Sequence, residues 1–127
     1  MKLKLIEVIN CNTVLNELST NKSANVRAVY KIAKINRELK KELELVEEQR
    51  LDIIRQYCSI DDNGRPIIEN QQYVIPAEHN KKLQQELNEF LSIEIKLNIE
   101  PLTLEDLEGF DLSSRQITEL LAIMEEN

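Results

Sequence analysis

The sequence has few of the residues that build ligand sites in many enzymes. Its 127 residues include two glycines, three prolines, one histidine and no tryptophan. Without a glycine-rich stretch, the chain lacks the phosphate-binding loops of the common nucleotide-binding designs. Aromatic residues make up only 4% of the chain, which leaves little to stack against single-stranded nucleic acid or a flat cofactor. We therefore expect no cofactor.

Cysteine is equally scarce. Cys11 and Cys58 lie far apart in the sequence, and neither has a cysteine or histidine neighbour at metal-ligand spacing. This pattern predicts neither a disulfide framework nor a zinc site, and it favours a reducing compartment.

The remaining candidates for chemistry match their motifs poorly. His79 has no recognisable nucleophile setting near it in the sequence, so we interpret it as a solvated side chain and not a general base. The run Asp61–Gly64 resembles the middle of a calcium loop, but Ser59 and Asn70 stand where the first Asp and the bidentate Glu belong. We predict no catalytic or metal-binding residues and no enzymatic activity.

Long hydrophobic runs are also missing. No segment approaches the length needed to span a membrane, and residues 1–9 are too short and too polar for a signal-peptide core. We expect a soluble, cytoplasmic protein that does not contact a membrane.

The chain does have one long amphipathic stretch, Ser23–Tyr57, with no glycine or proline. Its apolar residues recur at steps of three and four, which predicts a helix about 50 Å long. We call the following residues the apolar stripe: Ile32, Ile35, Leu39, Leu43, Val46, Arg50, Ile53 and Tyr57. Arg50, its one charged member, is interpreted either as a peripheral side chain or as a polar contact that fixes register between subunits.

A second helix, Ala77–Leu91, is predicted to return antiparallel to the first one, as in a coiled-coil hairpin. Between them, the Asn-Gly pair at 63–64 predicts a tight turn, with short strand arms around Ile67–Ile68 and Tyr73–Ile75. Because the second helix is about half as long as the first, part of the stripe has no obvious cover. The stripe is therefore our candidate surface for self-association or a partner.

Two segments that flank the helical hairpin predict a small sheet. Residues 93–99 alternate apolar and polar side chains, and Lys2–Val8 reads as a second strand that can pair with them. Short helices are predicted over Asn12–Leu18 and after Ser113, where Ser113 and Gln116 form a capping box. The fold class is α+β: a long helical hairpin packed with a small, mainly antiparallel β-sheet, in one elongated domain over residues 1–127.

Charge is unevenly distributed around a formal net charge of −7. A basic face on the long helix comprises Arg27, Lys31, Lys34 and Lys41, whereas residues 100–127 carry eight acidic residues and one arginine. The basic face is the best nucleic-acid signal in the chain, but the acidic excess makes internal charge pairing the preferred interpretation and argues against nucleic-acid binding. The acidic segment is alternatively a mimic of a phosphate backbone.

Three segments resemble small uncharacterised proteins of phages and prophages of Gram-positive bacteria. They are NTVLNEL at 12–18, YKIAKINREL at 30–39, and IKLNIEPLTLEDLEGFDLSSRQITELLAIM at 95–124. The resemblance spans most of the chain and implies a mobile-element protein expressed inside a bacterial cell. It implies no catalytic residue.

The expected function is therefore a non-enzymatic phage or mobile-element protein that acts by protein–protein binding, as in the inhibition of a host defence system. A homodimer or other homo-oligomer is expected. The alternative is a structural or assembly protein, such as a chaperone of virion morphogenesis, in which an exposed apolar stripe would shield a partner. A small enzyme ranks third.

Overall fold

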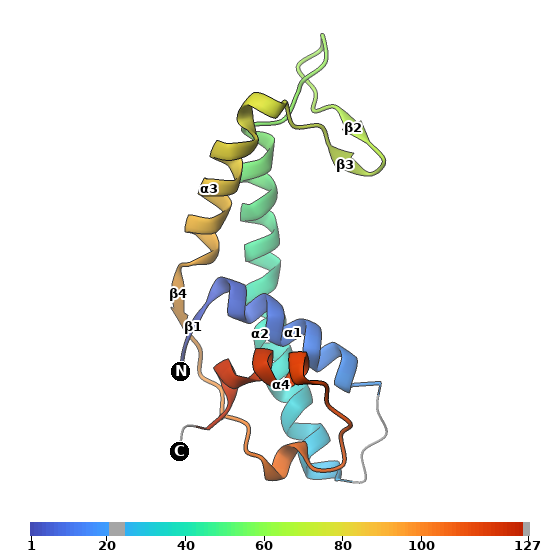
Figure 1. The fold of residues 1–127 in the computed structure, drawn as a ribbon, viewed down its shortest axis with the longest axis vertical. Helices are drawn as coiled ribbons and strands as arrows, with labels where there is room; N and C mark the ends of the chain where they lie inside the picture. Colours follow the sequence, from blue (N-terminus) through green and yellow to red (C-terminus); the bar gives the residue numbers. More distant parts are fainter. Residues whose placement is uncertain (21–24, 126–127) are drawn as a thin grey trace.

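The computed structural model describes residues 1–20 and 25–125 and shows an elongated molecule (Figure 1). A wider lower body contains the start of the chain and its C-terminal segment, and a narrower arm, coloured green to gold, rises from it. One helix, α2 (Val26–Arg55), runs through both parts. The expected α+β class, with a long helical hairpin and a small antiparallel sheet, is confirmed.

Helix α2 begins where the sequence supplies a cap. The Asn25 side chain accepts a hydrogen bond from the Ala28 N–H at 3.2 Å, which satisfies one of the free amides of the first turn. Ser23, the residue at which the predicted amphipathic stretch begins and a second residue type suited to capping, lies outside the described residues. The helix ends at Arg55, two residues before the predicted end at Tyr57.

The arm is the predicted helical hairpin. After a single 3₁₀ turn, η1 (Ala77–His79), helix α3 (Asn80–Leu91) runs back along α2 and buries Leu83. Strands β2 (Ile68–Glu69) and β3 (Gln72–Tyr73) pair beside the tip. Their turn lies at Asn70 and Gln71, both with positive φ, while Gly64 supplies a separate turn at φ +77°.

The sheet also forms, although its strands are shorter than predicted. Strand β1 (Lys2–Lys4) pairs antiparallel with β4 (Glu94–Lys96), and Leu3 faces Ile95. The prediction of a strand over Lys2–Val8 is wrong after Lys4, because helix α1 (Leu5–Leu18) begins there. The Glu7 carboxylate accepts the Lys4 N–H at 2.8 Å and so starts the helix.

Helix α1 is therefore twice as long as the predicted Asn12–Leu18 helix. Its buried side chains follow a helical period, and they are Leu5, Val8, Cys11, Val14, Leu15 and Leu18. Leu5 and Val8, three residues apart, begin this helical period within the segment predicted as a strand.

The C-terminal segment closes the lower body. It contains the 3₁₀ turn η2 (Glu105–Leu107), helix α4 (Ser114–Leu120) and the 3₁₀ turn η3 (Leu121–Ile123). The predicted capping box is confirmed: the Ser113 hydroxyl accepts the Gln116 N–H, and the Gln116 side chain accepts the Ser113 N–H. Leu102, Leu120 and Ile123 join the core formed with α1 and α2.

Three asparagines form a closed ring of hydrogen bonds between α1 and α2. Asn12 donates to Asn36 at 2.6 Å, Asn36 donates to Asn16 at 2.9 Å, and Asn16 donates to Asn12 at 3.2 Å. Asn36 is the one buried polar residue among those described. Because both polar ends of its amide are satisfied only in this alignment, the ring fixes how the two helices meet.

The two cysteines differ in environment. Cys11 is fully buried, and its thiol donates to the Glu119 carbonyl of α4 at 3.3 Å. Burial, reinforced by the nearby negative charges of Glu7 and Glu119, raises the pKa of Cys11 to about 12. Cys58 lies at the end of the arm and is only partly buried.

Replacing Asn36 with Ala is expected to lower the free energy of unfolding by about 1–3 kcal/mol, because two hydrogen bonds of the ring are lost. Urea denaturation measures this change. Asn88→Ala, at an exposed position of α3, is the matched control and should shift stability by less than about 0.5 kcal/mol. Equal losses in the two variants would contradict a special role for the ring.

A thiol reagent such as Ellman's reagent should label one cysteine per native chain quickly, and this should be Cys58. The buried, high-pKa thiol of Cys11 has almost no thiolate near neutral pH and should react only as the chain unfolds. Cys58→Ser should abolish the fast phase, and Cys11→Ser should leave it intact. Fast labelling of both thiols in the native protein would show that the lower body opens readily.

Candidate protein-binding groove

The first half of the apolar stripe forms core within the chain. Ile32, Ile35, Leu39 and Val46 are buried, and Leu43 packs against the same core from a partly buried position. Helix α1 and the C-terminal segment cover this half of α2. The expectation that part of the stripe is left uncovered is therefore wrong here, because it compared α2 with α3 alone.

The second half of the stripe lies in the arm and is half-buried. Two nitrogens of Arg50 donate hydrogen bonds to the carboxylate of Glu47 in the same helix, at 2.9 and 2.6 Å. This contact within one helix fits the interpretation of Arg50 as a peripheral side chain. Tyr57 donates a hydrogen bond to Glu86 of α3, and this bond raises the pKa of the phenol. Ile53 is half-buried between these two residues on the stripe.

The basic face is partly neutralised within the chain. The Lys31 Nζ lies 2.7 Å from Asp106 of η2, and Lys41 pairs with Glu38 at 2.9 Å. Arg27 and Lys34 are exposed. The Lys31–Asp106 pair joins the basic helix to the acidic segment, as internal charge pairing predicts.

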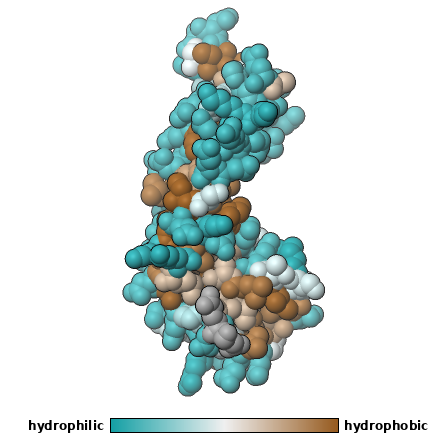
Figure 2. Space-filling view, turned by 60° about the vertical axis from the view of Figure 1, so that its left-hand side comes forward, coloured by the Kyte–Doolittle hydropathy of each residue, from teal (hydrophilic) through white to brown (hydrophobic). Residues whose placement is uncertain are grey.

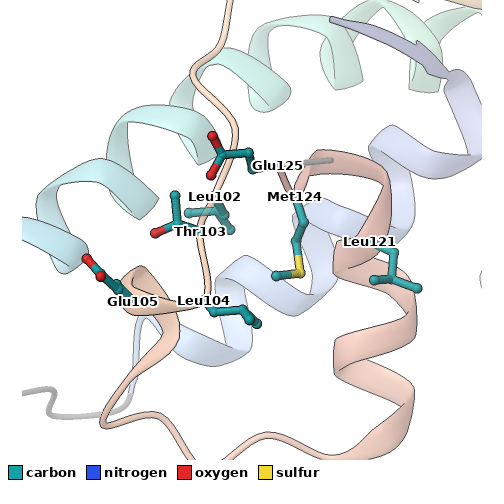
Figure 3. A pocket seen from close by; sticks show the side chains of 7 residues that line it. All are labelled: Leu102, Thr103, Leu104, Glu105, Leu121, Met124 and Glu125. Atoms are coloured by element: carbon teal, nitrogen blue, oxygen red, sulfur yellow. The ribbon is translucent and has the colours of Figure 1, made fainter. Parts of the chain in front are cut away.

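A groove of about 500 Å³ lies on the C-terminal segment, away from the stripe. Its apolar lining comes from Leu102, Leu104, Leu121 and Met124 (Figure 3). Leu104 is 71% exposed and Leu121 is 61% exposed, so two large apolar side chains that line one hollow lie mostly in water. The lower body carries apolar side chains on the side shown in Figure 2.

Backbone pairing holds the two sides of this groove together. The Leu102 N–H donates to the Ile123 carbonyl at 2.8 Å, and the Glu125 N–H donates to the Leu102 carbonyl at 2.7 Å. Leu102 is fully buried and lies at the floor of the groove, whereas Leu104, two residues later, is mostly exposed.

The turn that carries Leu104 is fixed by a reciprocal cap. The Thr103 N–H donates to Asp106 at 2.9 Å, and the Asp106 N–H donates to the Thr103 hydroxyl at 3.2 Å. Lys31 then ties Asp106 to α2. The groove wall is thus attached to the longest helix of the molecule through a pair of side chains that are each less than one-fifth exposed.

The same contacts set the charge of Asp106. Burial alone would raise its pKa, but hydrogen bonds from Lys31 and Thr103 outweigh burial and hold the pKa of Asp106 below its ordinary value. A carboxylate with a lowered pKa stabilises the fold above its unfolded-state pKa of about 3.9, and this contribution is lost as the pH falls through the lower folded-state value.

The rim of the groove is acidic. Glu105 and Glu125 line it and are exposed. No ion pair of the described residues includes either carboxylate. The arrangement, with apolar walls between free negative charges, suits an apolar side chain flanked by lysine or arginine.

Sequence reasoning did not find this groove. The sequence places Leu121 and Met124 at helical spacing after Ser113, which predicts the apolar face of a last helix, and it gives Leu104 no special role. The available signal was Leu104 itself, a leucine directly before the acidic pair Glu105–Asp106. What the sequence could not show was the pairing of residues 102 and 123–125, which brings the two walls together.

Comparison with known proteins assigns no family, since no family model, curated protein or solved structure matches the chain. Over residues 1–20 and 25–125, no three His, Cys, Asp or Glu side chains are grouped as metal ligands would be. None of the helices in this part of the chain is both long and apolar enough to cross a bilayer.

Asp106→Asn is expected to destabilise the protein by about 1–3 kcal/mol near neutral pH, because it removes the charge that Lys31 pairs with. The difference from wild type should begin to shrink as the pH falls below the unfolded-state pKa of about 3.9, and it should vanish below the lower folded-state pKa, where the wild-type carboxyl is protonated in both states. Urea denaturation at several pH values measures it. Glu105→Gln, its unpaired neighbour, should change stability little at any pH. A difference for Asp106→Asn that stays constant into acid would contradict the ion-pair explanation.

Proposed function

We propose that this chain is a non-enzymatic protein of a phage or other mobile element that acts by binding a protein of the host or the phage. The groove between residues 102–105 and 121–125 is the proposed contact surface. The observation that carries the proposal is the pair of mostly exposed leucines, Leu104 and Leu121, which face one hollow of about 500 Å³. The mobile-element context and the bacterial cytoplasm come from the resemblance of the sequence.

The groove supports this proposal better than the apolar stripe does. Most side chains of the apolar stripe are buried or half-buried where α2 packs against α1, α3 and the C-terminal segment. The leucines of the groove instead leave apolar surface exposed to water. A partner that covered this surface would gain about 25 cal/mol of binding free energy for each Å² of apolar surface buried. The backbone pairing at Leu102 keeps this surface formed without a partner, so little ordering cost is added on binding.

The acidic rim defines the partner chemically. A segment with one or two apolar anchors and flanking Lys or Arg side chains would fill the hollow and neutralise Glu105 and Glu125. Basic surfaces are what nucleic-acid-binding proteins present to the phosphate backbone, and the partner that we propose is a protein of this kind in a host defence system. Inhibition of such a protein by occupying its basic surface is the activity that we propose.

Replacing both groove leucines, Leu104→Asp and Leu121→Asp, should weaken partner binding at least about 30-fold, because the anchor of the contact becomes charged. The measurement is affinity capture from the native host, identification of a stoichiometric partner, and titration of that purified partner. Leu45→Asp is the matched control, since Leu45 is 55% exposed on α2 but outside the groove. Equal binding by the double variant and the control would refute the groove as the contact surface.

Two further measurements separate the classes of function. A complex guided by the acidic rim should weaken steeply as ionic strength rises, and a flat response would contradict that part of the proposal. His79→Ala should leave the biological effect unchanged, because a binding protein needs no general base there. Recovery of virion components instead of a cellular protein with basic surfaces would support the assembly alternative.

A further inference from the structure

Strand β4 is an open edge of the two-stranded sheet. Within the described part of the chain, β1 is its one strand neighbour. The backbone groups of the odd-numbered residues face β1: the Leu5 N–H donates to the Ile93 carbonyl at 3.0 Å, and the Leu97 N–H donates to the Met1 carbonyl at 2.8 Å. In an antiparallel pair, the N–H and C=O groups of Glu94 and Lys96 must then point away from β1.

This edge is accessible. Figure 1 places β4 on the outer side of the molecule, where the arm joins the lower body, and Figure 2 brings that side forward. Glu94 and Lys96 are exposed, and Ile93 beside them is 50% exposed. A strand edge with free backbone groups and a neighbouring apolar side chain is a template for another strand.

The charges on β4 select a second copy of the same strand. If two β4 strands pair antiparallel about a two-fold axis at Ile95, Glu94 of each copy faces Lys96 of the other. Both cross-strand pairs are then of opposite charge. On the other face of the sheet, Ile95 meets its own copy and the half-exposed Ile93 meets Leu97, so apolar surface is buried as well.

A like-charge contact inside the chain adds to this preference. Lys2 lies directly opposite Lys96 in the β1–β4 register, and like charges in that position are destabilising. A second copy would bring its Glu94 to the free side of Lys96 and offset the repulsion. The β1 edge has the opposite character, because self-pairing there would set Lys2 against Lys4.

We propose that the protein forms a two-fold homodimer through β4, which joins the two small sheets into one four-stranded antiparallel sheet in the order β1–β4–β4–β1. The interface uses residues 93–97, whereas the groove uses residues 102–105 and 121–125. The dimer is therefore independent of the proposed function, and either can fail without the other. The apolar stripe, which suggested self-association in the sequence, takes no part in it.

The first test is the oligomeric state, measured by sedimentation equilibrium at low ionic strength. The wild type should be a dimer, and Lys96→Glu or Glu94→Lys should each raise the dimer dissociation constant about tenfold or more, because both cross-strand contacts become repulsive. The double variant Glu94→Lys with Lys96→Glu restores opposite charges across the two-fold axis and should restore the dimer. It also keeps the net charge and merely exchanges which of Lys2 and Lys4 faces a like charge.

As a control, circular dichroism and thermal melting should be used to check that each variant is folded. A wild type that stays monomeric up to about 1 mM would overturn the proposal. So would single variants that dimerise as the wild type does, or a folded double variant that does not recover the dimer.

A second test locates the axis. In the proposed register, the two Ile95 residues form a non-hydrogen-bonded pair with Cα atoms about 4.5 Å apart, which a disulfide can bridge. In a Cys58→Ser background, Ile95→Cys should give a disulfide-linked dimer on mild oxidation. Lys2→Cys, on the other strand, should not. Cross-linking at position 2, or its absence at position 95 in a dimeric protein, would overturn the β4 interface.

Discussion

The contact between α1 and α2 organises this molecule, and the asparagine ring at Asn12, Asn16 and Asn36 determines its alignment. Apolar packing alone tolerates sliding of one helix along another, whereas a ring of amides is satisfied in one position only. The position of α1 places both neighbouring elements. The N–H of its first residue, Leu5, donates to the Ile93 carbonyl next to β4, and the buried Cys11 thiol donates to the Glu119 carbonyl of α4. Sheet and C-terminal segment are thus both positioned by one helix pair.

The helical hairpin was predictable because its signals are local: an uninterrupted apolar period in α2, a cap at Asn25, turn residues, and a second apolar period in α3. The Ser113–Gln116 capping box and the pairing of β1 with β4 were also predictable. The extent of α1 was not, since Leu3 and Leu5 continue a strand pattern across the residue where the helix begins. The cover of the stripe was missed for a different reason, because it comes from α1 and from residues far along the chain.

The candidate groove shows a similar limit. The acidic character of the last third of the chain is visible in the sequence, and its link to the basic helix was expected. However, the Lys31–Asp106 pair does more than neutralise charge, since Asp106 also holds the turn that presents Leu104. Which acidic residues are structural and which remain free at a surface depends on this geometry. Asp106 and Glu119 are paired inside the chain, while Glu105 and Glu125 keep the groove negative.

Because α2 belongs to both the lower body and the arm, there is no joint between them. Its 30 residues span about 45 Å without a glycine or proline. The continuous helix therefore sets the distance between the groove in the lower body and the β2–β3 hairpin at the far end of the arm. Two macromolecules gripped at opposite ends would be spaced by the protein itself, and lengthening α2 by whole turns would move them apart in steps of about 5.4 Å.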